Sequence, residues 1–148
     1  MKIILAQDKF FILRFDLDEE FPNEEFLNWL RENRIEGGYF WGLGNAQSIK
    51  AGYINIQEKQ YHFLDWRGSL EIAQLTGEIS LKENGELNAH THLTFSNEKL
   101  EAFAGHLDKL KVSATLELFL VKLPALKRKT DQRVGIQVFN SADLSLPD

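Results

Sequence analysis

Three of the four histidines in this 148-residue chain, His90, His92 and His106, fall within 17 positions of one another. Neutral imidazole is the commonest protein ligand for transition metals, and three imidazoles around Zn²⁺ leave a fourth coordination position open. The chain has no cysteine, which excludes thiolate ligands, thiolate nucleophiles and disulfides. A metal site in this sequence therefore has to be built from His, Asp or Glu.

The spacing of the three histidines is compatible with a β-hairpin. In a strand over 87–95, His90 and His92 project from the same face, because side chains alternate between the two faces of a strand. "SNEK" (96–99) has the composition of a turn, and His106 lies in the returning segment, 102–107. Pairing of 88–95 with roughly 101–107 brings the three rings together if a bulge or bend at Gly105 adjusts the register. The alternative is that the histidines are ordinary polar residues on an exposed sheet face.

The remaining elements read as one helix and many strands. A helix is predicted over 22–33, where Pro22 and Asn23 suit a helix start. Phe26, Leu27 and Leu30 give this helix one apolar stripe. Strands are predicted over 10–16, 39–43, 46–56, 60–66, 69–82, 87–95, 102–107, 111–122 and 134–139.

These elements predict an α+β fold, a curved and largely antiparallel β-sheet of about seven strands with one main helix packed on it. Within "KENGE" (82–86), Asn84-Gly85 favours a type I′ hairpin turn. The length is typical of a single domain, expected over 1–148 with a core at about 10–140.

The charge balance is acidic, with 17 basic and 22 acidic residues and a net charge of −5. Direct DNA binding by this chain alone is not expected, since non-specific DNA binding depends on phosphate neutralisation by Lys and Arg. The basic run "LKRKTDQR" (126–133) is interpreted as a solvated loop. No segment has the apolar length of a signal-peptide core or a membrane helix, so we expect a soluble, cytoplasmic protein without membrane contact.

The region around the histidines resembles the signature of the PPC domain family (plants and prokaryotes conserved domain). In that family an HxH strand is followed by a short turn and then Gly-His-Leu, as in "AHTHLTFSNEKLEAFAGHL" (89–107). Further similar segments are "FILRFD" (11–16), "FWGLGNAQSIKAGYIN" (40–55), "LEIAQLTGEIS" (70–80) and "GIQVFN" (135–140). The sequence departs from the family pattern at "DEEFPNEE" (18–25), where Gly-Glu is usual, and at Glu78, where Asn is usual.

The resemblance implies a homotrimer with a metal, zinc or another divalent transition ion, bound by His90, His92 and His106. It also implies a small-molecule ligand in a cleft between subunits, lined by Gly42 and Gly44. A cupin site is the rival interpretation, with Glu98 as an added ligand. However, the gaps from Gly85 to His90 and from His92 to Glu98 do not fit that motif, and its second half is missing.

Three functions are compatible with these observations. The first is a ligand-binding or regulatory module built on the histidine-bound metal. The second is a metal-dependent hydrolase or lyase, for which Glu71 and Glu78 are the candidate general bases. The third is DNA binding, a label that relatives carry because plant members add a basic AT-hook tail, whose Arg-Gly-Arg-Pro core does not occur here. His62 is interpreted as a surface or hydrogen-bonded histidine outside any site.

Overall fold

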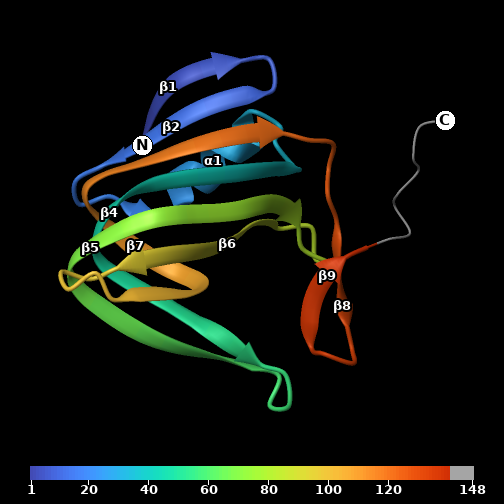
Figure 1. Cartoon of the computed structure of the whole chain (residues 1–148). Coiled ribbons are helices and arrows are strands. Elements are labelled where there is room, and N and C mark those ends of the chain that lie inside the picture. The colour runs from blue at the N-terminus through green and yellow to red at the C-terminus, as the bar shows by residue number, and fades with distance from the viewer. Residues whose placement is uncertain (141–148) are drawn as a thin grey trace.

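The computed structural model describes residues 1–140 and is built around one curled antiparallel sheet (Figure 1). The strand order is β1-β2-β7-β4-β5-β6, and the short β3 also pairs with β7. Because β6 pairs with β7 as well as with β5, the strands β4, β5, β6 and β7 close into a ring. The strands are β1 (Lys2–Gln7), β2 (Phe10–Asp16), β3 (Glu20–Phe21), β4 (Gly38–Asn55), β5 (Gln60–Leu81), β6 (Leu87–Ser96) and β7 (Ala102–Lys122).

Three strands are far longer than the sequence pattern predicted. Segments 39–43 and 46–56 form the single strand β4, 60–66 and 69–82 form β5, and 102–107 and 111–122 form β7. The predicted breaks at 44–45, 67–68 and 108–110 are wrong. Register shifts near Gly44 and Ala46 bend β4 against its neighbours without ending it, as β-bulges do. Because of these bends, one continuous strand runs through two parts of the ring.

The predicted helix is confirmed as α1 (Glu24–Glu32), the nine-residue helix of the described chain. The Asn23 side chain caps it, with Oδ1 accepting the Phe26 N–H at 2.8 Å. Its buried positions are Phe26, Trp29 and Leu30, so the apolar stripe includes Trp29, whereas Leu27 is only partly buried. Among the described residues, no helix is long and apolar enough to cross a membrane.

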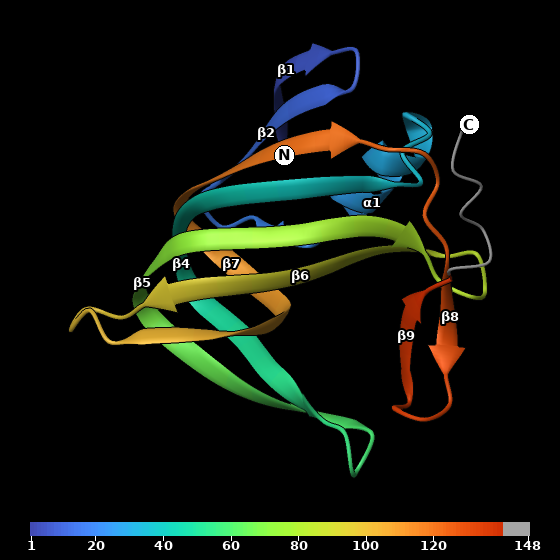
Figure 2. The same cartoon turned by 45° about the vertical axis from the view of Figure 1, so that its right-hand side comes forward.

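The core lies between α1 and the concave face of the sheet, and both views place the helix against that face (Figures 1 and 2). Four fully buried phenylalanines, Phe15, Phe21, Phe26 and Phe40, meet there in edge-on and tilted contacts with ring centroids 5.2–6.3 Å apart. The predicted curved antiparallel sheet with one packed helix is therefore confirmed. The helix is small, and strands dominate the fold.

The segment after β7 forms a separate two-stranded hairpin, β8 (Arg128–Asp131) and β9 (Ile136–Phe139), which we call the C-terminal arm (residues 126–140). Figures 1 and 2 show it beside the end of β5, away from α1. The interpretation of 126–133 as a solvated loop is wrong, since this segment includes β8 and the Arg128 side chain is only 10% exposed. Residues 141–148, part of the predicted domain, lie outside the described residues.

Both predicted turns are present, and one strand of the sheet was not predicted. The β5–β6 hairpin at Asn84-Gly85 is confirmed, but only Gly85 there has a positive φ (83°), so the turn is not type I′. The turn after Ser96 is also confirmed, with Asn97 Oδ1 accepting backbone N–H groups from Lys99 and Glu101. Strand β1 was not predicted. All of its residues are exposed, so its sequence carries no alternation of buried and exposed positions.

Candidate metal centre

The pairing of β6 with β7 places two of the three histidines side by side. His92 is the direct cross-strand partner of His106, and the pairing runs unshifted to Ser96 and Ala102. The hairpin is therefore confirmed, but the bulge expected at Gly105 is absent from this stretch. Gly105 instead lets β7 approach β4, since a Cβ at this position would lie 2.7 Å from the Gly52 carbonyl oxygen.

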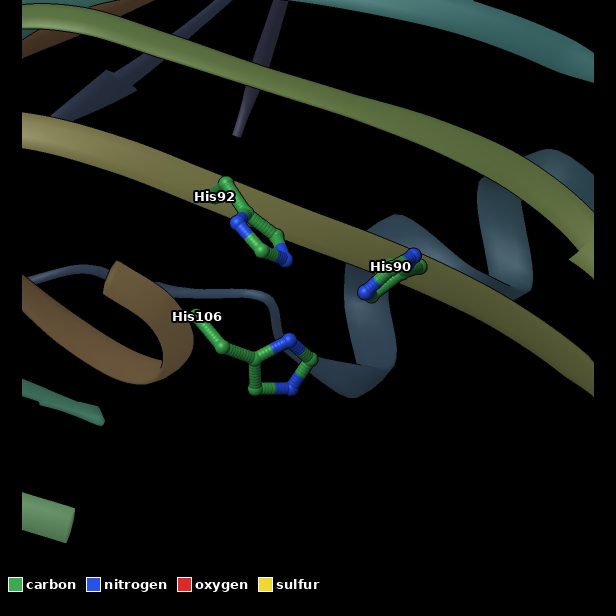
Figure 3. Close-up of side chains that lie close together, drawn as sticks. All are labelled: His90, His92 and His106. Carbon is green, nitrogen blue, oxygen red and sulfur yellow. The ribbon is translucent and has the colours of Figure 1, made fainter. Parts of the chain in front are cut away.

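His90 joins the pair from two positions earlier on β6, on the same outward face. The three ring centroids are 5.0–5.3 Å apart, and one potential ligand nitrogen from each ring lies within 4.8 Å of the others. Figure 3 shows the three rings gathered around a common space. A tetrahedral zinc ion, with bonds of about 2.0–2.1 Å, holds its ligand nitrogens roughly 3.4 Å apart. The rings thus need to close by at most about 1.4 Å, which side-chain rotation provides.

The surroundings favour the neutral form of two of these imidazoles. Burial, followed by the nearby His90 and His92 rings, lowers the pKa of His106 from its ordinary value of 6.5 to about 4. Burial and then the proximity of His90 also lower the pKa of His92. Neutral imidazole is the form that binds a metal. In addition, His106 Nδ1 is buried without a hydrogen-bond partner in the described chain, so the donor set fits a divalent transition metal.

A carboxylate and a guanidinium flank His90 on the side of its Nδ1 atom. Glu78 Oε1 lies 3.3 Å from this nitrogen and Arg128 Nη2 lies 3.2 Å from it. Glu78 and Arg128 also form an ion pair with each other. Glu78 was predicted as a candidate base, whereas the involvement of Arg128 was not foreseen, because no sequence pattern links two positions 50 residues apart.

The other candidate polar residues lie outside the cluster. Glu71 accepts a hydrogen bond from Asn45 on the exposed sheet surface and pairs with Ser96 in the ladder, so it is not near the histidines. Glu98, the ligand of the cupin interpretation, belongs to the turn after β6 and is not part of the cluster. His62 is exposed and 2.5 Å from Glu58, which confirms its interpretation as a hydrogen-bonded surface histidine.

Gly42 and Gly44 lie in the interior of β4, with β5 on one side and β7 on the other. A Cβ at Gly42 would lie 2.3 Å from the Glu117 carbonyl oxygen, and one at Gly44 would lie 2.2 Å from that of Thr115. The close approach of strands thus accounts for both glycines. Their role in a ligand cleft stays a prediction.

A cleft of about 740 Å³ opens next to the histidines. His90 and His106 line it together with Tyr61, whose ring lies 4.6 Å from that of His106. Leu27 of α1 contributes an apolar wall, and Phe139 of the C-terminal arm contributes another. A metal held by the three histidines would therefore border a cavity large enough for a small molecule.

The fold and the cluster together define a small, strand-dominated protein with a candidate three-histidine metal centre. The sequence model of the Plants and Prokaryotes Conserved (PCC) domain matches residues 5–124, which is most of the chain. The chain therefore belongs to this family, the PPC family that its motifs resemble. No curated protein sequence matches it significantly.

Several solved structures share the fold. A plant- and prokaryote-conserved protein from Pyrococcus horikoshii has 28% identity and a TM-score of 0.80, over 97% of each chain. A metal-containing protein from Archaeoglobus fulgidus has 26% identity and a TM-score of 0.81, over 95% of this chain and 100% of that one. A candidate DNA-binding protein from Bacteroides thetaiotaomicron has 21% identity and a TM-score of 0.87, over 95% and 97%. At 21% identity, the similarity to the Bacteroides thetaiotaomicron protein shows a shared fold alone.

Proposed function

We propose that this protein binds a divalent transition metal, with zinc as the first candidate, through His90, His92 and His106. The observation that carries the proposal is the placement of three imidazole nitrogens within 4.8 Å on one paired hairpin. The neutral state of His106 and its unpartnered Nδ1 atom support it. The similar Archaeoglobus fulgidus protein, which is metal-containing, supports it as well.

The metal would hold a small ligand at its open coordination position. Three neutral imidazoles leave the ion its full positive charge, so an anionic or carbonyl-bearing molecule is the ligand class that suits it. The adjoining cleft offers space together with apolar walls at Leu27 and Phe139. The protein would act as a cytoplasmic binding or regulatory module.

Assembly as a homotrimer is part of the same proposal. Tyr39 and Trp41 are exposed on the outer face of β4, where Trp41 stacks on Phe119 at 5.7 Å. Exposed aromatic patches are typical of protein interfaces. The register places Trp41 beside Thr76, and Thr76 beside His92, on one face of the sheet. A neighbouring subunit covering the patch would thus stand next to the histidines and form a cleft between subunits.

A metal-dependent hydrolase or lyase requires a general acid or base facing the same cleft. Glu78 is close to His90, but Arg128 holds it in an ion pair and its side chain is only 15% exposed. Asp108 lines the cleft and is bound to Lys50 at 2.9 Å. Because both carboxylates are already paired, we favour binding over catalysis.

Direct DNA binding has weaker support from the surface charge. Within the basic run, Arg128 is largely buried in its ion pair, and the exposed Arg133 is paired with Asp131 at 2.6 Å. Lys127 and Lys129 are its exposed lysines. Two lysines neutralise few phosphates. We expect no mobility shift of duplex DNA above physiological salt.

The metal proposal is tested on protein purified without a histidine tag. Elemental analysis should find close to one zinc or other transition ion per chain, and His92→Ala should lose it. His62→Ala is the matched control, because His62 is an exposed histidine outside the cluster, and it should retain the metal. Wild-type protein without bound metal, and without affinity for added Zn²⁺ in a chelator competition, would refute the proposal.

A further inference from the structure

The charged side chains of the cleft beside the histidines already have partners of opposite charge. Apart from the histidines, the charged residues that line this cleft in the described chain form three ion pairs, Lys82 with Glu86, Asp108 with Lys50, and Arg128 with Glu78. A charge with an opposite partner so close attracts a further charge only weakly. A ligand that places one negative charge on the metal is therefore expected to be uncharged over the rest of its length.

The apolar walls of the cleft come from segments that are far apart in the sequence. Leu27 of α1 forms one wall, and Ile136, Val138 and Phe139 of β9 in the C-terminal arm form another. Small-molecule sites are lined mostly by apolar side chains, with a few polar groups that fix the orientation of the ligand. The cleft has this composition, with the candidate metal ligands as part of its polar lining.

Phe139 is held in the wall of the cleft by Arg128. The guanidinium lies over the Phe139 ring, 4.7 Å from its centroid. Arg128 Nε also donates to Ser80 Oγ of β5 at 3.1 Å, and its Nη1 donates to the carbonyl oxygen of Gln137. Arg128 thus fixes β9 against the main sheet. Phe139 remains 50% exposed, so much of its surface is free to contact a ligand.

Two neutral polar side chains of the cleft form no hydrogen bond with another residue of the described chain. They are the Tyr61 hydroxyl and the Asn88 amide. Tyr61 packs its ring 4.6 Å from that of His106, and Asn88 precedes His90 by two positions on β6. Both groups can donate a hydrogen bond to a carboxylate. A carboxylate suits them as a head group, because one of its oxygens can accept such a bond while the other binds the metal.

We propose that the ligand of this cleft is a small monocarboxylate with an apolar chain, whose carboxylate binds at the metal and whose chain packs against Leu27 and Phe139. These two residues are then specificity-determining, since they select the length of the apolar chain. The inference rests on the proposed metal-binding function and names the class of its ligand. The wall that contains Phe139 lies beyond the segment matched by the family model, 5–124.

The first test measures how affinity depends on the ligand. Protein loaded with Co²⁺ is titrated with acetate, butyrate, hexanoate and succinate, and the visible absorption of the metal reports entry of a carboxylate into its coordination sphere. Burial of one methylene group corresponds to about a fourfold gain in affinity, so we expect about this gain for each methylene added from acetate to hexanoate. Succinate has the chain length of butyrate and a second charge. It should bind about tenfold more weakly than butyrate, because that charge would meet apolar walls.

The second test assigns this dependence to the two walls. Phe139→Ala should reduce the gain per methylene to below about twofold and leave the affinity for acetate unchanged, whereas Phe139→Leu keeps an apolar wall and should retain most of the gain. Leu27→Phe narrows the cleft and should weaken binding of hexanoate but not of acetate. Leu17→Ala is the matched control, because Leu17 is 60% exposed and does not line the cleft. The melting temperature of each variant reports whether its fold is intact.

Three results would overturn this inference and leave the metal proposal intact. The first is a metal-loaded wild type that binds none of the carboxylates. The second is equal affinity for acetate and hexanoate, or binding of succinate as tight as that of butyrate. The third is a gain per methylene that stays at the wild-type value in both Phe139→Ala and Leu27→Phe. Failure of the wild type to bind Co²⁺ or Zn²⁺ at all would instead refute the proposed function.

Discussion

His92 and His106 are direct partners across the β6–β7 ladder, with ring centroids 5.3 Å apart. Their spacing is thus set by backbone hydrogen bonds between strands, and not by a loop. His90 lies on the same strand and face as His92, so the same strand pairing fixes its position. A site of this kind exists before the metal arrives, so binding should stabilise a fold that is already formed.

Metal binding should raise thermal stability. At a free Zn²⁺ concentration 100 times the Kd, a ligand that binds only the folded state adds about 2.7 kcal/mol to the free energy of unfolding. For a chain of this size we expect roughly a 5–10 °C rise in melting temperature. Differential scanning fluorimetry with and without a chelator measures it. An equal rise in His106→Ala would show that the ion binds elsewhere.

Acidification should destabilise the metal-free protein through His106. The pKa of this group is about 4 in the fold and near 6.5 in the unfolded chain, so the unfolded state binds more protons between these values. Above about pH 6.5, His106 is neutral in both states and does not make the free energy of unfolding depend on pH. As the pH drops from 6.5 toward 4, protonation of His106 in the unfolded chain lowers the free energy of unfolding. Urea midpoints at pH 7.5, 6 and 5 should decline more steeply for wild type than for His106→Gln. Equal declines of the urea midpoint in the two proteins would contradict the low pKa of His106 in the fold.

The aromatic patch on β4 should hold the assembly together. Trp41→Glu puts a charge into the proposed contact and should convert a trimer into 17.1 kDa monomers, as measured by light scattering after size exclusion. Leu100→Glu is the matched control, because Leu100 is 81% exposed in the β6–β7 turn, outside the patch. A monomeric wild type at micromolar concentration would argue against the homotrimer.

Gly42→Ala should destabilise the fold itself. The added Cβ would lie 2.3 Å from the Glu117 carbonyl oxygen, which is backbone and can yield only if β4 and β7 separate. We expect a loss of about 1–3 kcal/mol in the free energy of unfolding, the usual range for overpacking. Gly85→Asn, at a turn with open space and a φ that Asn tolerates, should cost much less. Chemical denaturation measures both. Full stability of Gly42→Ala would favour a ligand role for this glycine.

The sequence predicted the parts of the site that depend on local spacing. His90 and His92 share a face because strands have a period of two, and the fourteen residues to His106 allow a short hairpin. Arg128 and the full lengths of β4, β5 and β7 were missed. The bulged bends near Gly44 resemble strand ends in the sequence, and the contact of Arg128 with Glu78 depends on where the arm docks. Strand β1 was missed because an exposed strand has no pattern of burial to detect.

Strand β7 takes part in both the histidine pair and the hydrophobic centre of the molecule, since it pairs with β6 at one end and with β2, β3 and β4 along the rest. Leu116, Leu118 and Leu120 anchor it in the interior without any help from an ion. The empty and the loaded protein should therefore have the same architecture, unlike small zinc domains that unravel when stripped. Such a framework would allow a bound cation to leave and return without unfolding of the protein.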